Sequence, residues 1–244
     1  EERLAIYLMA RRAGQIVAAG TELPLIEPKN LIAAQIKKDE IRLVGQNADV
    51  VNSAVFSPDS QYVLSTSRDG TAKVWDAATG AGADTELLTL SGHAGGVNAA
   101  AWSPGGDQIA TAATDGLVRV WRLPWGSSFP GAEAGGEVLF TLTGHDGEVR
   151  GVAWSPDGER LATSSDDSKA RLWDAATGDE LLDLYPVNYT SFVIIGAVWS
   201  PSGDRVVTLS GDGTATVWDA TTGAELITLI GHSAGLFSAA WSPS

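Results

Sequence analysis

The sequence predicts an all-β fold built from repeated four-stranded antiparallel sheets, and three observations carry this prediction. The pair Trp-Asp recurs at Trp75, Trp173 and Trp218, and a related segment ends at Trp121-Arg122. Each of these positions closes a segment with one order: an apolar run, Ser-Pro, a second apolar run, an Asp turn and a run ending in Trp. The Trp-to-Trp spacings are 46, 52 and 45 residues, close to the length of repeats that form stacked or circular arrays.

Each repeat reads as four strands separated by turns. Ser, Pro, Asp and Gly, which tight turns favour, separate the first strand from the second, and Asp-Gly or Asp-Ser, a hairpin signal, separates the second from the third. The expected first strands are 51–56, 97–102, 149–154 and 195–199; the second 62–66, 108–112, 160–164 and 205–209; the third 71–75, 117–121, 170–173 and 214–218; the fourth 86–90, 138–142, 180–184 and 225–229. These strands are nearly continuous apolar runs, so we expect both faces of each sheet to be covered.

Composition excludes several classes of function. The chain of 244 residues has no Cys, which rules out disulfides and Cys-based metal or redox chemistry and is typical of a reducing, cytoplasmic location. The net charge is −14, and residues 41–244 carry all of the excess, with 24 acids against 10 bases. Such a surface repels phosphate and anionic lipid, so we expect neither a nucleic-acid nor a membrane partner. No apolar run approaches the ~20 residues of a membrane span.

Motifs for catalysis or cofactor binding are absent from the sequence. It contains no Gly-x-x-x-x-Gly-Lys phosphate loop, no Gly-x-Ser-x-Gly elbow and no His-Glu-x-x-His pair. The paired carboxylates Asp166-Asp167 are interpreted as part of a turn, because no loop has the spacing of a calcium-binding EF-hand. All three His residues, His93, His145 and His232, follow a Gly within the repeat. We therefore predict no metal and no cofactor.

With these residues in view, the chain resembles the WD-repeat β-propeller family over residues 40–244. The match is specific because Gly92-His93 and Gly144-His145 each lie at the same offset, 28 positions from His to Trp, before Trp121 and Trp173. The resemblance implies a β-propeller of four-stranded blades, with four complete blades in this chain. Partial blades at both ends make us expect a fragment of a larger ring, with further blades after Ser244.

The resemblance also implies a buried tetrad of His, Ser or Thr, Asp and Trp in each blade. Imidazole, hydroxyl, carboxylate and indole N–H can satisfy one another in sequence. The second blade would use His93, Thr111, Asp115 and Trp121, and the third His145, Thr163, Asp167 and Trp173. The first blade has Gly45-Gln46 in place of Gly-His and keeps Ser65, Asp69 and Trp75, and the fourth keeps Thr208, Asp212 and Trp218.

The two ends of the chain depart from the repeat. The last unit starts at Gly231-His232 and continues into a predicted strand over 236–241, while 40–44 reads as an isolated fourth strand. Residues 1–39 are predicted to be a helical connector or the end of an upstream domain, with helices over Arg3–Ala19 and Leu31–Ile36. Trp125, in the long connection 123–136, is interpreted either as a cap on the outer rim or as an exposed partner anchor.

In relatives of this kind the face around the ring axis binds partners. Carried over by spacing, that partner-binding face comprises Asn52, Arg68, Asn98, Thr114, Glu148, Arg150, Asp166, Val193, Ile195 and Phe237. A mixture of aliphatic, aromatic and paired charged groups suits a protein or peptide partner. The hypothesis is a non-enzymatic protein-interaction scaffold or sensor. Two alternatives stay open: a propeller hydrolase or lactonase with a central metal, and a structural subunit of a large assembly.

The repeats also resemble those of bacterial WD-repeat proteins. Two turns read Trp-Asp-Ala-Ala-Thr-Gly, at 75–80 and 173–178, and one reads Trp-Asp-Ala-Thr-Thr-Gly, at 218–223. In bacteria such arrays are often attached to signalling NTPases, kinases or caspase-like proteases. The resemblance therefore implies a sensor within a larger multidomain chain.

Overall fold

The computed structural model describes residues 49–77, 86–124, 136–185 and 192–242, together with the backbone of four short strands before residue 49. Four antiparallel sheets of four strands each make up the main body. We call them blades 1 to 4 in chain order. The predicted all-β fold is confirmed, and the sheets have the form of β-propeller blades.

The strands agree with the sequence prediction to within one residue at every end. Blade 1 contains β5 (Val51–Phe56), β6 (Tyr62–Ser67), β7 (Thr71–Asp76) and β8 (Glu86–Ser91). Blade 2 contains β9 (Val97–Trp102), β10 (Gln108–Ala113), β11 (Val118–Arg122) and β12 (Glu137–Leu142). Blade 3 contains β13 (Val149–Trp154), β14 (Arg160–Ser165), β15 (Ala170–Asp174) and β16 (Glu180–Leu184). Blade 4 contains β17 (Ile194–Trp199), β18 (Arg205–Ser210), β19 (Ala215–Asp219) and β20 (Glu225–Leu229).

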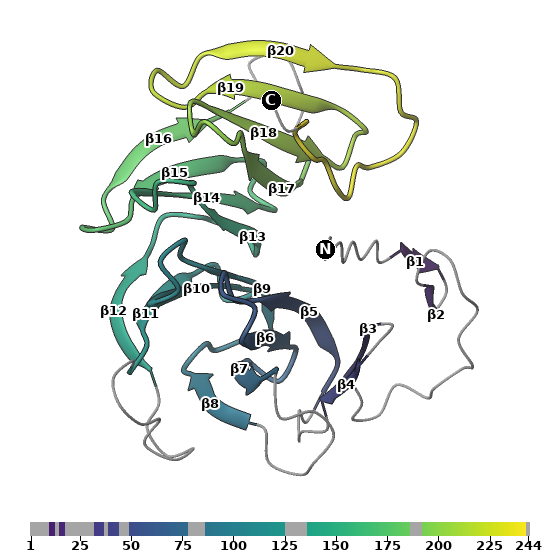
Figure 1. The fold of residues 1–244 in the computed structure, drawn as a ribbon. Coiled ribbons are helices and arrows are strands. Elements are labelled where there is room, and N and C mark those ends of the chain that lie inside the picture. Colours follow the sequence, from purple (N-terminus) through teal and green to yellow (C-terminus); the bar gives the residue numbers. More distant parts are fainter. Residues whose placement is uncertain are drawn as a thin grey trace.

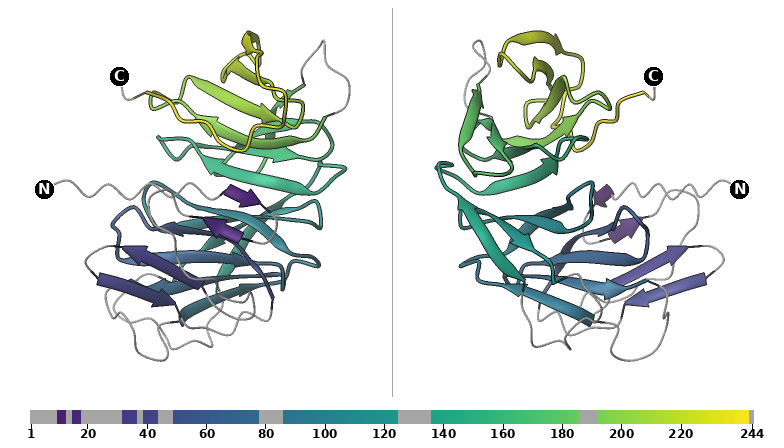
Figure 2. Two further views of the ribbon diagram at one scale, coloured as in Figure 1. Left: turned by 90° about the vertical axis from the view of Figure 1, so that its right-hand side faces the viewer. Right: turned by 60° about the vertical axis from the view of Figure 1, so that its left-hand side comes forward.

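The four blades follow one another around an arc, with β5, β9, β13 and β17 on its inner side and the fourth strands on its outer side (Figure 1). Neighbouring inner strands contact each other, β5 with β9, β9 with β13 and β13 with β17. Side views show the blades stacked one after another (Figure 2).

Because strands alternate in direction, each blade presents two kinds of turn at opposite ends. One end carries the Ser-Pro turns and the turns that follow Trp-Asp, and we call it the Ser-Pro face. The other end carries the Asp turns and the Gly-His loops, and we call it the Asp-turn face. These two faces are the surfaces on which ligands or partners can approach the inner strands.

Each Ser-Pro turn is held by its buried serine. The Ser57 hydroxyl accepts the amide N–H of Tyr62 at 2.9 Å and donates to the Asp59 carboxylate at 2.5 Å. The same amide contact recurs at Ser103, Ser155 and Ser200, with distances of 3.0, 2.9 and 3.0 Å. A hydroxyl serves as donor and acceptor at once, which explains why the repeat uses serine here.

Between successive blades the apolar faces form continuous cores, as the sequence predicted. Leu88 and Leu90 of blade 1 lie in one cluster with Trp102, Ile109 and Trp121 of blade 2. Equivalent clusters join blade 2 to blade 3 and blade 3 to blade 4. These clusters, rather than any single blade, hold most of the buried apolar surface, which is the main favourable term in folding.

The inner-strand tryptophans add a polar link between blades. Trp154 Nε1–H donates to the carbonyl of Ala101, and Trp199 Nε1–H donates to that of Ala153, both at 3.2 Å. Trp241 makes the same contact with Val198, also at 3.2 Å. Trp241 therefore sits where an inner strand of a next blade would place it.

The predicted strand over 236–241 is wrong, since the structure shows no ladder there. Leu236, Ala239 and Trp241 pack on Val207, Leu209 and Ala215 of blade 4, and the Leu236 amide bonds the Ser210 carbonyl at 3.1 Å. A strand needs a hydrogen-bonded neighbour along its length, and side-chain packing alone does not supply one.

The helix predictions in 1–39 are also wrong where the structure describes this region. Its residues form β1 (Ala10–Arg12) with β2 (Gln15–Val17), and β3 (Ile32–Ile36) with β4 (Asp39–Leu43), as two antiparallel pairs. Short apolar runs do not distinguish strand from helix by periodicity, and the β-branched Ile and Val residues of β2 and β3 favour strands. β4 agrees with the strand expected over 40–44, and the domain boundary at residue 39 stays a prediction.

One prediction compares two leucines at the same repeat position. Leu90 is 2% exposed because blade 2 covers it, whereas Leu229 of blade 4 is 56% exposed. Leu90→Ala should remove about 2–5 kcal/mol of unfolding free energy, and Leu229→Ala should change it by less than about 1 kcal/mol. Urea midpoints of the 244-residue chain measure both. Equal losses would show that inter-blade burial is not what stabilises the arc.

Candidate functional site: the tetrads and the Asp-turn face

Blade 3 contains a complete chain of hydrogen bonds from an indole to a carboxylate. Trp173 Nε1–H donates to Thr163 Oγ1 at 2.9 Å, and that hydroxyl lies 2.7 Å from His145 Nε2. His145 Nδ1 lies 2.7 Å from Asp167 Oδ2. One direction of donation satisfies every group: indole to hydroxyl, hydroxyl to Nε2, and Nδ1–H to carboxylate. These contacts assign His145 as the neutral Nδ1–H tautomer.

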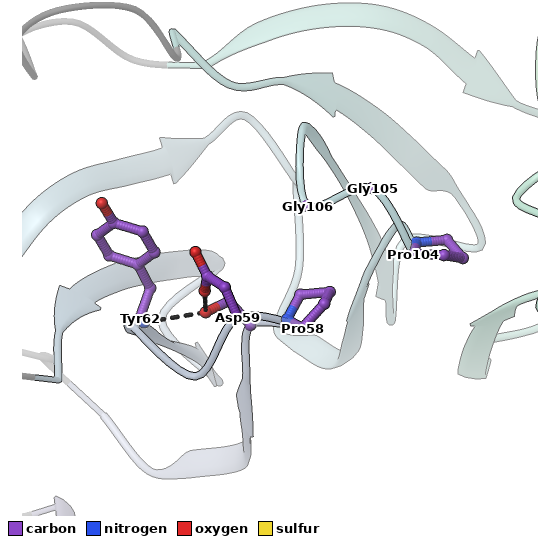
Figure 3. A pocket seen from close by; sticks show the side chains of 7 residues that line it. Pro58, Asp59, Tyr62, Pro104, Gly105 and Gly106 are labelled. Carbon is purple, nitrogen blue, oxygen red and sulfur yellow. Dashed lines mark hydrogen bonds between the residues drawn. The ribbon is translucent and has the colours of Figure 1, made fainter.

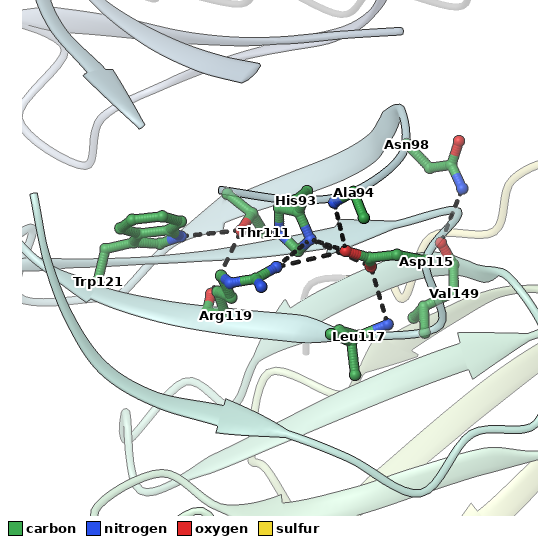
Figure 4. Close-up of polar contacts among 9 residues, drawn as sticks. All are labelled: His93, Ala94, Asn98, Thr111, Asp115, Leu117, Arg119, Trp121 and Val149. Carbon is green, nitrogen blue, oxygen red and sulfur yellow. Dashed lines mark hydrogen bonds and ion pairs between the residues drawn. The ribbon is translucent and has the colours of Figure 1, made fainter. Parts of the chain in front are cut away.

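Blade 2 repeats these contacts around His93 (Figure 4). Trp121 Nε1–H and His93 Nε2 both meet Thr111 Oγ1 at 2.8 Å, and His93 Nδ1 lies 3.0 Å from Asp115 Oδ2. Arg119 adds a cation here, with its guanidinium 3.4 Å from Asp115 Oδ2 and 2.7 Å from His93 Nδ1. Both tetrads expected to be complete are thus assembled as the resemblance implied.

Blades 1 and 4 keep only half of this chain. Trp75 Nε1–H donates to Ser65 Oγ at 2.8 Å, and Trp218 Nε1–H donates to Thr208 Oγ1 at 2.9 Å. The sequence places no His in either blade's Gly-His position. Here a threonine two residues after the Asp supplies a hydroxyl donor to the carboxylate, Thr71 to Asp69 at 2.6 Å and Thr214 to Asp212 at 2.7 Å.

The predicted tetrads did not include that threonine, although the sequence carries a signal for it. The triplet Asp-Gly-Thr occurs in the two blades without His, whereas the blades with His have Asp115-Gly-Leu and Asp167-Ser-Lys. A hydroxyl at this position therefore accompanies the loss of the imidazole. A carboxylate with too few donors in a partly buried turn is costly, which gives the substitution a physical reason.

Burial lowers the pKa of both tetrad imidazoles below the ordinary value of 6.5, although the neighbouring Asp115 and Asp167 act in the opposite sense. Burial acts to raise the pKa of Asp167, but hydrogen bonds from His145 and from backbone N–H groups outweigh it and leave that pKa lowered. At neutral pH each tetrad therefore holds a neutral imidazole beside an ionised carboxylate. The two imidazole side chains are 1% and 2% exposed, so the arrangement is structural and offers no base to a substrate.

On the Asp-turn face, five positions that align in the repeat follow the arc: Asn52, Asn98, Arg150, Ile195 and Phe237, of which the first four lie on inner strands. The first two link blades. Asn52 Nδ2–H donates to the carbonyl of Val97, and Asn98 Nδ2–H donates to that of Val149, at 2.8 and 2.9 Å. Sequence spacing predicted these asparagines on the partner-binding face, and the structure adds a role between blades that spacing within one repeat does not reveal.

Arg150 forms an ionic cluster with two acids of the same blade. Its Nε and one terminal nitrogen donate to the two Asp166 oxygens at 2.7 and 2.6 Å, and Glu148 lies 3.3 Å from that terminal nitrogen. The Asp166 hydrogen bonds are the chief cause that raises the pKa of Arg150 above its usual value. Repeat spacing predicted these three residues on one face, and the structure brings them together.

Apolar groups lie at the equivalent positions of the next units. Val193 is 37% exposed and Phe237 is 81% exposed, while Ile195 is partly buried. The backbone of the face repeats regularly, since the amides of Arg68, Thr114, Asp166 and Gly211 bond the carbonyls of Val50, Gly96, Glu148 and Val193. From the first blade to the end of the chain, the residue at the aligned position thus changes from asparagine to an ion-paired arginine and then to apolar residues. Trp125 lies outside the described residues.

In the described ranges, no three His, Cys, Asp or Glu side chains come together in a way that could hold a metal ion. No helix of the described part is long and apolar enough to cross a membrane.

The model of the family described as "WD domain, G-beta repeat" matches residues 38–76, 84–122, 136–174 and 187–219, together more than half of the chain. The chain belongs to the WD-repeat family. Each match covers the first three strands of one blade, and the second and third matches begin with the fourth strand of the blade before. The Trp and hydroxyl contacts described above lie within the matched ranges.

Several WD-repeat relatives are similar over about one blade. The guanine nucleotide-binding protein subunit beta of Oryza sativa subsp. indica is 43% identical over 44 residues, 18% of this chain and 12% of that protein. The WD40 repeat-containing protein HOS15 of Arabidopsis thaliana is 48% identical over 44 residues, 18% of this chain and 7% of that protein. The serine-threonine kinase receptor-associated protein of Bos taurus is 41% identical over 49 residues, 20% and 14% of the two chains. The similarity covers only a small part of these relatives.

The tetrad makes a direct stability prediction. His145→Ala leaves the Thr163 hydroxyl and the Asp167 carboxylate without their shared partner, which should cost about 1–3 kcal/mol. His232→Ala is the matched control, because its Gly-His step is exposed, and it should change stability by less than about 0.5 kcal/mol. Urea unfolding followed by tryptophan fluorescence measures both variants. Similar losses in the two variants would contradict a structural role for the tetrad.

Acid should destabilise the fold through the same histidines. The unfolded chain takes up protons near pH 6.5, whereas the folded chain does so at lower pH because burial lowers the pKa of His93 and His145. Their stability contribution is therefore complete above about pH 6.5 and falls as the pH drops towards the folded pKa, by up to about 1.4 kcal/mol per pH unit per group. His145→Gln should lose less stability between pH 7 and pH 5 than the unchanged chain. Identical pH profiles would rule out this linkage.

Proposed function

We propose that the chain is a non-enzymatic interaction module that docks a protein or peptide partner on its Asp-turn face. The observation that carries the proposal is the change in side-chain character along the five aligned repeat positions. The side chains of Asn52 and Asn98 each donate a hydrogen bond to a backbone carbonyl of the next blade. Arg150, Ile195 and Phe237 stand at the same repeat position but do not make that hydrogen bond.

The chemistry of this surface suits a polypeptide partner. Aromatic residues and arginine are enriched among the residues that dominate protein–protein binding energy, and here Phe237 and Arg150 lie at aligned positions with Val193 and Ile195 at the intervening blade. The ion pairs of Arg150 fix its orientation in the unbound chain, which lowers the entropy lost on binding. The fold alone does not decide the function, so the proposal rests on these side chains.

The names of two relatives support the same reading. One is a subunit of a guanine nucleotide-binding protein, and another is a protein associated with a kinase receptor. Both names describe proteins that assemble with other proteins. We extend this to a sensing role in the cytoplasm, with the propeller attached to a signalling effector. The relatives compared above are eukaryotic, so the bacterial origin that the repeats suggest stays a prediction.

A photo-cross-linking experiment tests the docking face. A benzoyl-phenylalanine at position 237 in the native cells should cross-link to a discrete partner protein, and Arg150→Glu should abolish that product by reversing a charge within the contact surface. The control position is Arg205, which is exposed on the opposite, Ser-Pro face, and it should not yield the same product. Identical products from both positions, or a product that persists in Arg150→Glu, would refute the proposal.

A further inference from the structure

The Ser-Pro turns of successive blades meet in a repeated contact on the Ser-Pro face. A Cβ placed on Gly106, Gly158 or Gly203 would lie 3.9, 3.5 or 3.6 Å from Cδ of Pro58, Pro104 or Pro156 in the preceding blade. All three glycines have a positive φ, between 73° and 76°, which only glycine adopts readily. The space beside each contact is therefore built by the same backbone in all three junctions.

At the junction of blades 3 and 4 this space holds a guanidinium of the chain itself. Arg160 donates to the carbonyls of Ala220 and Gly203 at 2.9 and 2.6 Å. Its Cζ lies 4.7 Å from the ring centroid of Trp199. The Asp157 carboxylate faces the same guanidinium; its pKa is lowered chiefly by the Ser155 hydroxyl and, to a smaller extent, by Arg160. Stacking, two carbonyl acceptors and a nearby carboxylate together satisfy the planar cation.

At the junction of blades 1 and 2 an open hollow of about 430 Å³ lies between the corresponding Ser-Pro turns (Figure 3). It is lined by Ser57, Pro58, Asp59 and Tyr62 of blade 1 and by 104–106 of blade 2. Tyr62 stands at the repeat position of Arg160, and Asp59 at that of Asp157. The Tyr62 ring packs near Trp102, with ring centroids 6.5 Å apart, and the hollow remains beside it.

We propose that this hollow binds an arginine side chain of a partner protein or peptide. The chain's own Arg160 site is the template, since the two junctions share the backbone of their Ser-Pro turns and their carboxylate, and the Tyr62 ring gives the hollow an aromatic wall. Asp59 supplies the counter-charge, because the Ser57 hydroxyl and the Gln61 N–H both donate to its carboxylate and hold it in place.

Arginine is preferred over lysine because a planar guanidinium stacks on aromatic rings and donates in a fork, whereas an ammonium is a compact point charge. The chain's net charge of −14 also attracts a basic peptide. The site lies on the face opposite the docking surface proposed above and does not depend on it.

The test uses the 244-residue chain and the probe peptide acetyl-Gly-Arg-Gly-amide, with acetyl-Gly-Lys-Gly-amide for comparison. Backbone amide resonances of Gly105 and Gly106 report occupancy of the hollow. The arginine peptide should shift both resonances to saturation, and the lysine peptide should bind at least about fivefold more weakly. Absence of a saturable shift, or equal binding of the two peptides, would overturn the proposal.

Two variants test whether the charge of Asp59 contributes to binding. Asp59→Asn keeps the contact with Ser57 but removes the charge, and it should weaken the arginine peptide about fivefold or more. Asp157→Asn, at the junction that Arg160 already fills, is the matched control and should not change binding.

Tyr62→Arg should place the chain's own guanidinium in the hollow and abolish binding, with folding checked by circular dichroism. Binding unaffected by Asp59→Asn, or by a folded Tyr62→Arg, would refute the site. Arg150→Glu on the Asp-turn face should leave peptide binding intact, so failure here and failure of the docking face are distinguishable.

Discussion

The structure depends on the burial of each sheet against the next one. Leu88 and Leu90 reach Trp102, Ile109 and Trp121 across the first junction, and the same arrangement recurs at the two that follow. Burial between sheets removes the indole N–H of each third-strand tryptophan from water, so that this N–H needs an acceptor within the protein. The second-strand hydroxyl is that acceptor in all four blades. The tetrad is thus a consequence of packing.

The need to satisfy each buried polar group also explains which members of the tetrad vary between blades. In every blade the turn Asp accepts the amide N–H two residues further on, at 2.8–3.1 Å. This contact holds the turn whether or not an imidazole is present. The histidine is an additional link between hydroxyl and carboxylate, and Thr71 or Thr214 takes over its donor role towards the Asp. The carboxylate is required by local turn geometry, and the imidazole is replaceable.

The sequence predicted best what depends on contacts within one repeat. Strand positions followed from Ser-Pro and Asp turns, whose residues fix the backbone locally, and the tetrads at His93 and His145 followed from fixed offsets. It predicted poorly what depends on a partner elsewhere. The hydrogen bond from Asn52 to the next blade and the packing of 236–241 both involve a neighbouring blade. The runs at β1 and β3 are too short to show a helix or strand period. Arg160 was missed because its acceptors, Ala220 and Gly203, are far away in sequence.

A repeated backbone makes each blade a control for its neighbours. Where the same position carries Asn98, Arg150 and Ile195 in turn, or Tyr62, Gln108 and Arg160, the main chain is nearly constant and only the side chain changes. Differences in binding between one junction and the next must then come from those side chains, because the framework that presents them is shared. The residues that hold the fold together are the same or similar in each repeat. The exposed positions whose residue differs between repeats are the ones at which this arc can bind a partner.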